Sequence, residues 1–410
     1  MAAEVTHASP LLAVLEEHGG VVHDYHGRRL VRHFGDPHAE YVAATGGVAV
    51  FDRSHRSRLR VSGKAPAQML SGVLTGVIPG EPGSPGEPGA PGKPGAPEGP
   101  ELPGELAAPG LPGESGVLDP VDDGVTGGTA TYHAVLTPKG RMITDLVAMR
   151  LGDEDGIGFL LDVPVAGHAG LSAHLKKVLP PRLAAVQDVS EEWASISIVG
   201  PEGAAALAKL ALGLRVDADW LLGAKEGEWR RVGSPEQGML VVRTAEVWPP
   251  AWSVYGPSAA ISALWRALVR DGAVPAGLGV WSTLRVEAGR PVFGTDMDDS
   301  TIPPEAGIVD RAIDQTKGCY TGQEVIVRIR DRGHVNRHLR QLDLDDIPAP
   351  AAGTELMSSD GSGKVVGRIT SVVQSPRAGG VLALAYVRRG VERVLLGDEE
   401  IVVPEELAGS

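Results

Sequence analysis

The sequence predicts an α+β protein that contains a duplicated α+β region followed by a small C-terminal antiparallel β-barrel. The same order of strands and helices occurs twice, and the strand end Val61-Ser62-Gly63 matches Ile198-Val199-Gly200 at an offset of 137 residues. From about His334 onward, short alternating runs are separated by Pro and Gly, which is typical of a small barrel. The 410 residues are enough for two or three domains.

The pattern divides the chain into four regions. We expect an N-terminal extension over 1–20, a first α+β unit over 21–190, a second over 191–335 and the barrel over 336–405.

Alternating and helical spacing of apolar residues predicts the elements of each unit. In the first unit these are strand 57–62, helix 65–74, strands 129–137, 142–151 and 157–163, helix 165–178 and strand 183–189. In the second they are strand 194–199, helix 202–212, strands 239–243 and 251–254, and helix 258–270. In the barrel they are strands 339–344, 364–373, 381–387 and 400–403.

A segment rich in Gly and Pro, residues 79–116, interrupts the first unit between a helix and a strand. Glycine recurs at every third position from Gly80 to Gly95, which is the collagen-like spacing. Six such triplets are too few for a stable triple helix, so we expect a disordered, extended insert. Without the insert, the offset between the two units shrinks to 99 residues.

Composition excludes several classes of function. The net charge of −14 argues against DNA binding and against direct RNA binding by charge. No apolar run is long enough to span a bilayer, and the N-terminus lacks the features of a signal peptide, so a cytoplasmic protein is expected. Cys319 is the only cysteine, so one chain forms no disulfide and no multi-cysteine metal site, and no metal site is expected.

The densest local motif surrounds this cysteine. It consists of Lys317, Gly318, Cys319, Tyr320, Thr321, Gly322, Gln323 and Glu324, followed by an apolar run. Thr321 and Glu324 have the spacing of a capping box, which predicts that a helix begins there. The thiol of Cys319 then lies just before a helix N-terminus and near the charge of Lys317, and both features favour a thiolate. A lone cysteine is also often a buried apolar residue without chemistry.

These residues resemble the signature of the YgfZ family. The resemblance also covers Leu284–Pro291, Ile302–Glu305 and, more weakly, Phe51–His55 and Thr137–Arg141. Members of that family are folate-binding relatives of the glycine-cleavage T protein, an aminomethyltransferase, and are implicated in the assembly or repair of iron-sulfur enzymes and in tRNA modification. The resemblance implies a duplicated folate-binding region and a barrel, arranged as a ring of three lobes around a channel.

The resemblance also implies the roles of individual residues. Cys319 would be the functional thiol, with Lys317 and the rest of the motif shaping its site, and Asp145 would be a carboxylate next to the folate. A pterin ring requires a carboxylate that accepts N–H donors, and a glutamate tail requires Arg. The candidates for folate binding are Arg243, Glu246, Arg285, Glu287 and Arg328. Thr144 precedes Asp145 where T proteins carry an acidic pair, which argues against aminomethyl transfer.

Two functions therefore compete. The first is an accessory protein that binds a tetrahydrofolate and uses Cys319 for assembly or repair of iron-sulfur clusters. One thiolate does not hold a cluster alone, so any cluster contact would be transient or shared with a client or assembly protein. The alternative is a folate-dependent, aminomethyltransferase-like enzyme in which Asp145 positions the reacting groups.

Overall fold

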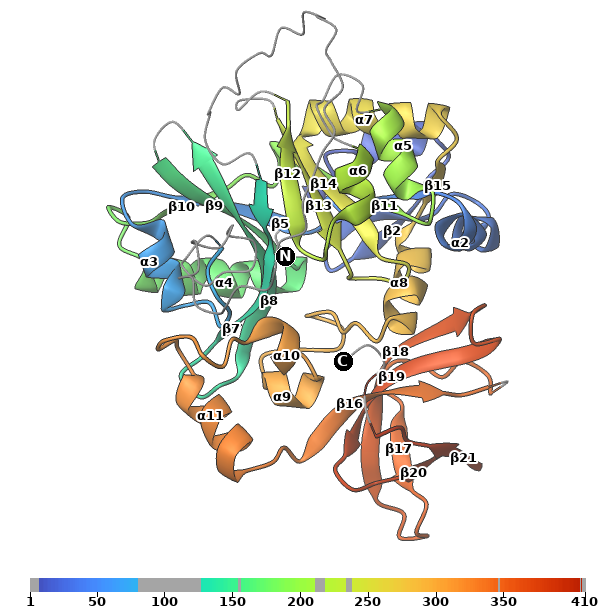
Figure 1. Ribbon diagram of the computed structural model, residues 1–410. Coiled ribbons are helices and arrows are strands. Elements are labelled where there is room, and N and C mark those ends of the chain that lie inside the picture. The colour runs from blue at the N-terminus through green and yellow to red at the C-terminus, as the bar shows by residue number, and fades with distance from the viewer. Residues whose placement is uncertain are drawn as a thin grey trace, which may run out of the picture.

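The computed structural model describes residues 7–79, 127–153, 156–210, 218–233, 238–345, 347–405 and 407. Two β-sheets with helices on their outer faces form the upper part of the molecule in Figure 1, and a third sheet, near the C-terminus, lies below them. The collagen-like insert lies outside the described residues. None of the described helices is both long enough and apolar enough to cross a membrane.

The first of these sheets has five strands in the order β10-β5-β9-β8-β7. Its strands are β5 (Ser57–Ser62), β7 (Thr131–Leu136), β8 (Met142–Asp153), β9 (Gly156–Val163) and β10 (Ala185–Asp188). Helices α3 (Pro66–Ser71) and α4 (Val165–Val178) pack against it. Leu171 and Leu175 of α4 are fully buried against the sheet, which fixes this helix in place.

A seven-stranded sheet has the order β15-β4-β11-β14-β13-β12-β6. Its strands are β4 (Ala49–Asp52), β6 (Gly127–Thr129), β11 (Trp193–Val199), β12 (Glu228–Val232), β13 (Met239–Thr244), β14 (Ala251–Pro257) and β15 (Val274–Ala276). Helices α5 (Gly203–Leu210), α6 (Ala218–Gly223) and α7 (Ser258–Arg270) accompany it. The fully buried Ile261, Trp265 and Leu268 of α7 form part of its core.

Two glycines occupy equivalent turns at the ends of β5 and β11. Gly63 has φ +143° and Gly200 has φ +119°. A Cβ would lie 2.6 Å from the carbonyl oxygen of Leu183 in the first turn and 2.2 Å from that of Gly47 in the second. Only glycine therefore fits these turns without displacing backbone.

The N-terminal residues are part of the second sheet's core. A small sheet of β1 (His7–Ala8), β3 (Arg28–His33) and β2 (Val21–Tyr25) is followed by α2 (Pro37–Gly46), and α1 (Leu12–Glu17) precedes β2. Leu11 and Leu15 are fully buried. The segment expected as an extension over 1–20 thus packs into the domain from its first described residues onward.

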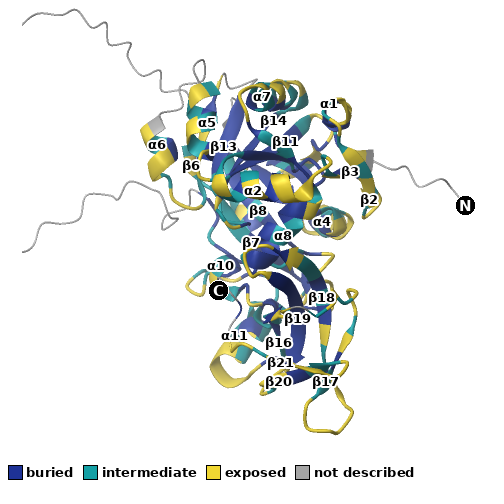
Figure 2. Ribbon diagram, turned by 90° about the vertical axis from the view of Figure 1, so that its right-hand side faces the viewer, coloured by how far each residue is buried: buried dark blue, intermediate teal, exposed yellow. Residues whose placement is uncertain are grey.

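Helices α8 (Leu278–Glu287), α9 (Pro303–Ala306), α10 (Val309–Ala312) and α11 (Gln323–Arg332) connect the second sheet to the barrel. The third sheet contains β16 (Arg337–Asp343), β17 (Glu355–Ser358), β18 (Val365–Ser375), β19 (Gly380–Arg388), β20 (Arg393–Leu396) and β21 (Glu399–Val402). All its pairings are antiparallel, and β19 is buried over nearly its whole length (Figure 2). The predicted C-terminal antiparallel barrel is confirmed.

Several element boundaries differ from the prediction. The strand predicted over 129–137 is two strands, because the chain leaves the seven-stranded sheet after β6 and enters the five-stranded sheet as β7. The helix predicted over 65–74 is the shorter α3. Strand β4 comes from the first predicted unit but pairs with β11 of the second, so the sheets do not follow the boundary at residue 190.

Candidate functional site

A cavity of about 640 Å³ lies between the two upper sheets and the segment that follows α8. Strands β7 and β8 provide one wall, and β13 and the turn after it provide another. Four predicted site residues line this cavity: Asp145, Arg243, Glu246 and Arg285. Cavities of this size are typical of sites for small molecules.

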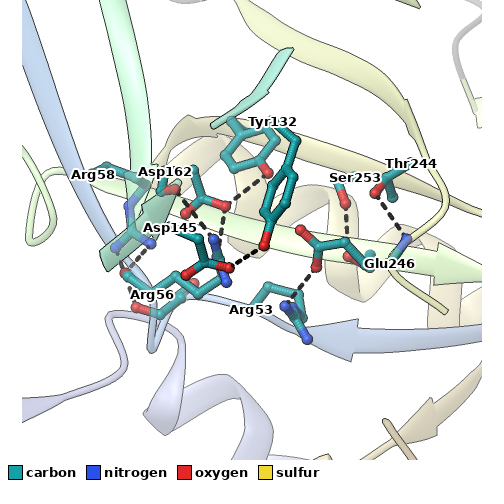
Figure 3. A network of polar contacts seen from close by, with 12 residues as sticks. Arg53, Arg56, Arg58, Tyr132, Asp145, Asp162, Thr244, Glu246 and Ser253 are labelled. Carbon is teal, nitrogen blue, oxygen red and sulfur yellow. Dashed lines mark hydrogen bonds and ion pairs between the residues drawn. The ribbon is translucent and has the colours of Figure 1, made fainter. Parts of the chain in front are cut away.

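Asp145 is the carboxylate of β8 that faces the cavity. Its Oδ2 accepts a hydrogen bond from the Tyr132 hydroxyl at 2.7 Å, whereas the buried Oδ1 has no partner among the described residues (Figure 3). Burial raises the pKa of Asp145, even though the nearby Arg56 guanidinium lowers it. The side chain therefore holds a proton more readily than an ordinary aspartate does, and one of its oxygens is unsatisfied by the described residues.

Thr144 points to the opposite face of the same strand. A Cβ added to Gly167 of α4 would lie 1.9 Å from the Thr144 hydroxyl oxygen, so Thr144 packs directly beneath that helix. Neighbouring residues of a strand face opposite sides of the sheet. Thr144 therefore does not line the cavity, whereas Asp145 does.

Glu246 follows β13 and is another of the carboxylates that line the cavity, together with Glu226, Asp310 and Asp314. It pairs with Arg53 at 2.9 Å, and the Arg53 guanidinium stacks over the Trp281 ring at 3.6 Å. Burial raises the pKa of Glu246, but Arg56, Arg53 and Arg311 outweigh this effect, so the pKa is lowered. Asp145 and Glu246 thus have pKa values shifted in opposite directions, as in sites where one acid is protonated and the other is charged.

Arg56 stands between these carboxylates. Its Nε donates to Oδ2 of Asp162 at 2.7 Å, and the Tyr255 hydroxyl donates to the same oxygen at 3.1 Å (Figure 3). Burial lowers the pKa of Arg56, but Asp162, Glu246 and Asp145 outweigh burial and raise it. The guanidinium is therefore a permanent positive charge in the wall of the cavity.

Three further arginines line the outer part of the cavity. Arg243 lies over the Trp252 ring at 5.2 Å and donates to the carbonyl of Pro250 at 3.1 Å. Arg311 lies over the Tyr132 ring at 4.9 Å, and Arg290 donates from Nε to a backbone carbonyl. Of these three lining residues, Arg243 was among the residues predicted from sequence, whereas sequence reasoning missed Arg290 and Arg311.

The remaining folate candidates have other surroundings. Arg285 lines the cavity but forms a buried pair with Asp296 at 2.8 Å. Glu287 lies outside the lining, where it accepts hydrogen bonds from Tyr41 and from Ser375 of the barrel. Arg328 is exposed on α11 and also lies outside the lining. The structure therefore brings Asp145, Arg243, Glu246 and Arg285 together and leaves Glu287 and Arg328 apart.

The cysteine motif lies outside the cavity lining. Cys319 is exposed, and the Lys317 ammonium donates to the carbonyls of Leu74 and Gly76 at 2.8 and 2.6 Å. Lys317 thus holds the cysteine loop against the turn after α3. Gly318, Gly322 and Glu324 do not line the cavity, and Tyr320 and Gln323 line a separate apolar cavity of about 170 Å³.

The predicted capping box at Thr321 was wrong. The N-cap of α11 is Gly322, with φ +86°, and no side chain caps the helix. The Thr321 backbone N–H and hydroxyl both bond to the carbonyl of Gly72, so its side chain is not available to the helix. Cys319 therefore lies one residue farther from the helix than predicted.

Sequence reasoning also missed Arg53, Arg56, Tyr132 and Trp281 as site residues. The signal for Arg53 was present in the segment Phe51–His55, which carries part of the family resemblance. Tyr132 could not be found, because only the pairing of β7 with β8 brings it beside Asp145. Among the described residues, no group of three or more His, Cys, Asp or Glu is arranged to hold a metal ion.

Comparisons with known proteins agree with this architecture. Residues 122–317 match the family profile described as the GCVT N-terminal domain, and residues 337–404 match the glycine cleavage T-protein C-terminal barrel domain. An aminomethyltransferase of Rubrobacter xylanophilus is 31% identical over 280 residues, covering 68% of this chain and 70% of the relative. An aminomethyltransferase of Saccharopolyspora erythraea is 26% identical over 388 residues, covering 93% and 90%.

A solved structure has the same fold. The crystal structure of the glycine cleavage system aminomethyltransferase T from Bartonella henselae superposes with a TM-score of 0.74, at 20% identity, over 99% of this chain and 98% of that chain.

Proposed function

We propose that this chain, which belongs to the glycine cleavage T-protein family, binds a reduced folate in the 640 Å³ cavity. In this proposal it acts as an aminomethyltransferase-like one-carbon transferase. The observation that carries the proposal is the buried Asp145, which lines this cavity and whose Oδ1 has no hydrogen-bond partner among the described residues. A buried acceptor of this kind costs stability unless a ligand satisfies it.

The side chains around the cavity fit a reduced folate. Asp145 and Glu246 provide the carboxylate oxygens that accept the N–H donors of a pterin ring. Arg243, Arg290 and Arg311 provide guanidinium groups for the carboxylates of the glutamate tail. A reduced folate supplies the amine that accepts the one-carbon unit.

The shifted pKa values assign different tasks to the two carboxylates. Asp145 has a raised pKa, so its free Oδ1 is suited to holding and passing a proton. Glu246 stays charged beside Arg53 and orients a donor without exchanging its proton. The Arg53 and Trp281 stack fixes this pair in position.

The test is an assay with tetrahydrofolate and an aminomethylated lipoyl carrier, in which formation of methylenetetrahydrofolate is measured. Asp145→Asn keeps the shape but removes the acid, so we expect kcat/KM to fall about 100-fold or more. The matched control is Asp299→Asn, which changes an exposed carboxylate outside the lining and should retain activity. Absence of product with the unaltered chain, or equal activity of Asp145→Asn, would refute transfer through this residue.

The exposed Cys319 favours a second candidate function. Lys317 and Thr321 fix its loop to the residues just after α3, so the thiol has a defined position that is open to another protein. This suits the accessory role in iron-sulfur cluster assembly or repair that the YgfZ resemblance implies, with the thiol acting by transient contact.

The two candidates make different predictions for Cys319→Ser in cells that lack the native chain. If the accessory role is correct, the variant lowers the activity of iron-sulfur enzymes such as aconitase and leaves folate affinity within about two-fold, because the thiol lies outside the cavity. Unchanged aconitase activity would discard the thiol role and leave the transferase proposal untouched.

A further inference from the structure

A second chamber of about 390 Å³ adjoins the folate cavity. Arg53, Trp281 and Arg285 line both, so the stacked Arg53 and Trp281 form part of the partition between them. The second chamber extends to β2, β3 and β18, none of which contributes to the first.

The lining of the second chamber is strongly biased toward positive charge. Of the described residues that line it, none is Asp or Glu, whereas four are arginines, namely Arg32, Arg53, Arg56 and Arg285. The lining of the 640 Å³ cavity, in which we propose that folate binds, contains both acidic and basic side chains. Three of the four arginines are paired with Glu246, Asp162 and Asp296, which lie outside this lining. Arg32 is exposed and has no ion-pair partner in the described part of the chain.

Two helices begin at this chamber. Val165, the first residue of the 14-residue α4, and Leu278, the first residue of the 10-residue α8, both line it. The N-cap of α4 is Pro164, and no side chain of the described residues caps that helix, whereas the backbone N–H of Gly277, the N-cap of α8, donates to Oε2 of Glu40 at 2.9 Å. The free N–H groups and the helix dipole at the start of α4 therefore favour an anion at this place.

His55 provides an independent indication of a ligand. It lines the chamber, is only 7% exposed, and its buried Nδ1 has no hydrogen-bond partner among the described residues. Burial, and then the charges of Arg53 and Arg56, hold the pKa of His55 well below the ordinary value, so the ring is neutral. A neutral imidazole with an unsatisfied nitrogen is suited to one hydrogen bond with a bound molecule.

Apolar side chains form the rest of the lining, including Leu30, Phe293 and Val372. We propose that this second chamber, which Arg32 also lines, binds a small organic anion, whose carboxylate or phosphate group lies at the start of α4 and whose apolar body packs against these side chains. The proposal does not rest on the folate assignment, because Arg32, His55 and Val165 line the second chamber and do not line the folate cavity.

The test measures binding of benzoate and phenyl phosphate to the full chain by ligand-detected NMR, with benzamide as the neutral control. We expect at least one of the two anions to bind about tenfold or more tightly than benzamide. If benzoate binds more tightly, the site is assigned to carboxylates, and if phenyl phosphate does, to phosphates. Equal affinity of both anions and benzamide would overturn the proposal.

Val165→Asp and Val165→Asn form a matched pair that localises the site. Residue 165 is half-buried at the start of α4, so Asp places a tethered carboxylate in the proposed anion position, while Asn has the same shape without the charge. We expect Val165→Asp to weaken binding of the tighter anion about tenfold or more and Val165→Asn to change it by less than about threefold. Equal effects of the two substitutions would show that the charge at this position is irrelevant and would refute the site.

Arg32→Gln provides a second variant at an exposed position that does not threaten folding. We expect it to weaken anion binding about threefold to tenfold, and Arg32→Lys to restore most of the affinity. Binding of 5-formyltetrahydrofolate is measured in the same variants. If Val165→Asp weakens folate and anion binding equally, the chamber is part of the folate site and the proposal of a separate anion site fails.

Discussion

Asp145 and Glu246 face the same cavity, yet their surroundings shift their pKa values in opposite directions. The difference arises from their partners. Asp145 has a tyrosine hydroxyl on one oxygen and no described partner on the other, whereas Glu246 pairs with Arg53. Each residue could be proposed from sequence by family resemblance, but the direction of its pKa shift depends on Tyr132 and Arg53, which only the fold brings into contact.

The first prediction at the residue scale concerns stability and pH. Burial raises the pKa of Asp145 above the ordinary 3.8, so the folded state binds this proton more tightly than the unfolded chain does. Stability is therefore lost as pH rises from 3.8 through the raised pKa. We expect Asp145→Asn to raise the free energy of unfolding at pH 7 by about 0.5–2 kcal/mol, as is common where function requires a destabilised group.

Urea denaturation at several pH values checks this expectation. The advantage of Asp145→Asn should shrink as pH falls toward 3.8, because the wild-type carboxyl is then protonated in both states. A variant less stable than the wild type at pH 7 would show that Asp145 stabilises the fold in its charged form.

At the scale of elements, local signals predict some boundaries well. Helices α4 and α7 have the predicted bounds, and a proline precedes each of them, at Pro164 and Pro257. The start of α11 was misplaced because the Thr321 hydroxyl bonds to Gly72, a residue far away in the sequence. Similarly, the change of sheet between β6 and β7 depends on long-range pairing with β12 and β8, which the local pattern does not contain.

The second prediction concerns the N-cap of α11. Gly322 has φ +86°, and a Cβ there would lie 2.7 Å from the carbonyl oxygen of Thr137. We expect Gly322→Ala to lower the free energy of unfolding by about 1–3 kcal/mol, since both backbone strain and the close approach penalise a side chain. The matched control is Gly318→Ala in the same loop, where nothing lies within 4 Å of the added Cβ.

Thermal unfolding of the two variants distinguishes them. Gly318→Ala should unfold close to the wild-type temperature and Gly322→Ala clearly below it. Equal unfolding temperatures would contradict the expected strain of a side chain at residue 322.

At the scale of the whole molecule, polar contacts connect the barrel to the two upper sheets. Asp296 accepts hydrogen bonds from Arg285 of α8 at 2.8 Å and from Thr370 and Ser371 of β18 at 2.6 Å each. Figure 1 shows α8 between the seven-stranded sheet and the barrel. The sequence predicted the barrel from its alternating strands, but not this contact, because Arg285 was interpreted as a folate ligand.

The third prediction follows from this contact. Asp296→Ala leaves the buried Arg285 without its carboxylate, so we expect a loss of about 3–5 kcal/mol in the free energy of unfolding. Asp299→Ala, three residues away and exposed, should change it by less than about 0.5 kcal/mol. Chemical denaturation measures both, and equal effects would contradict a structural role for the buried pair.

The stack of Arg53 on Trp281 has a consequence for how the two chambers communicate. If molecules occupy both chambers, they touch the same pair of side chains, so a shift of that pair caused by one molecule would alter the affinity for the other. Thermodynamic linkage makes such an influence reciprocal and equal in size. A single guanidinium and a single indole would thus couple two separate binding events, provided that both chambers bind their proposed ligands.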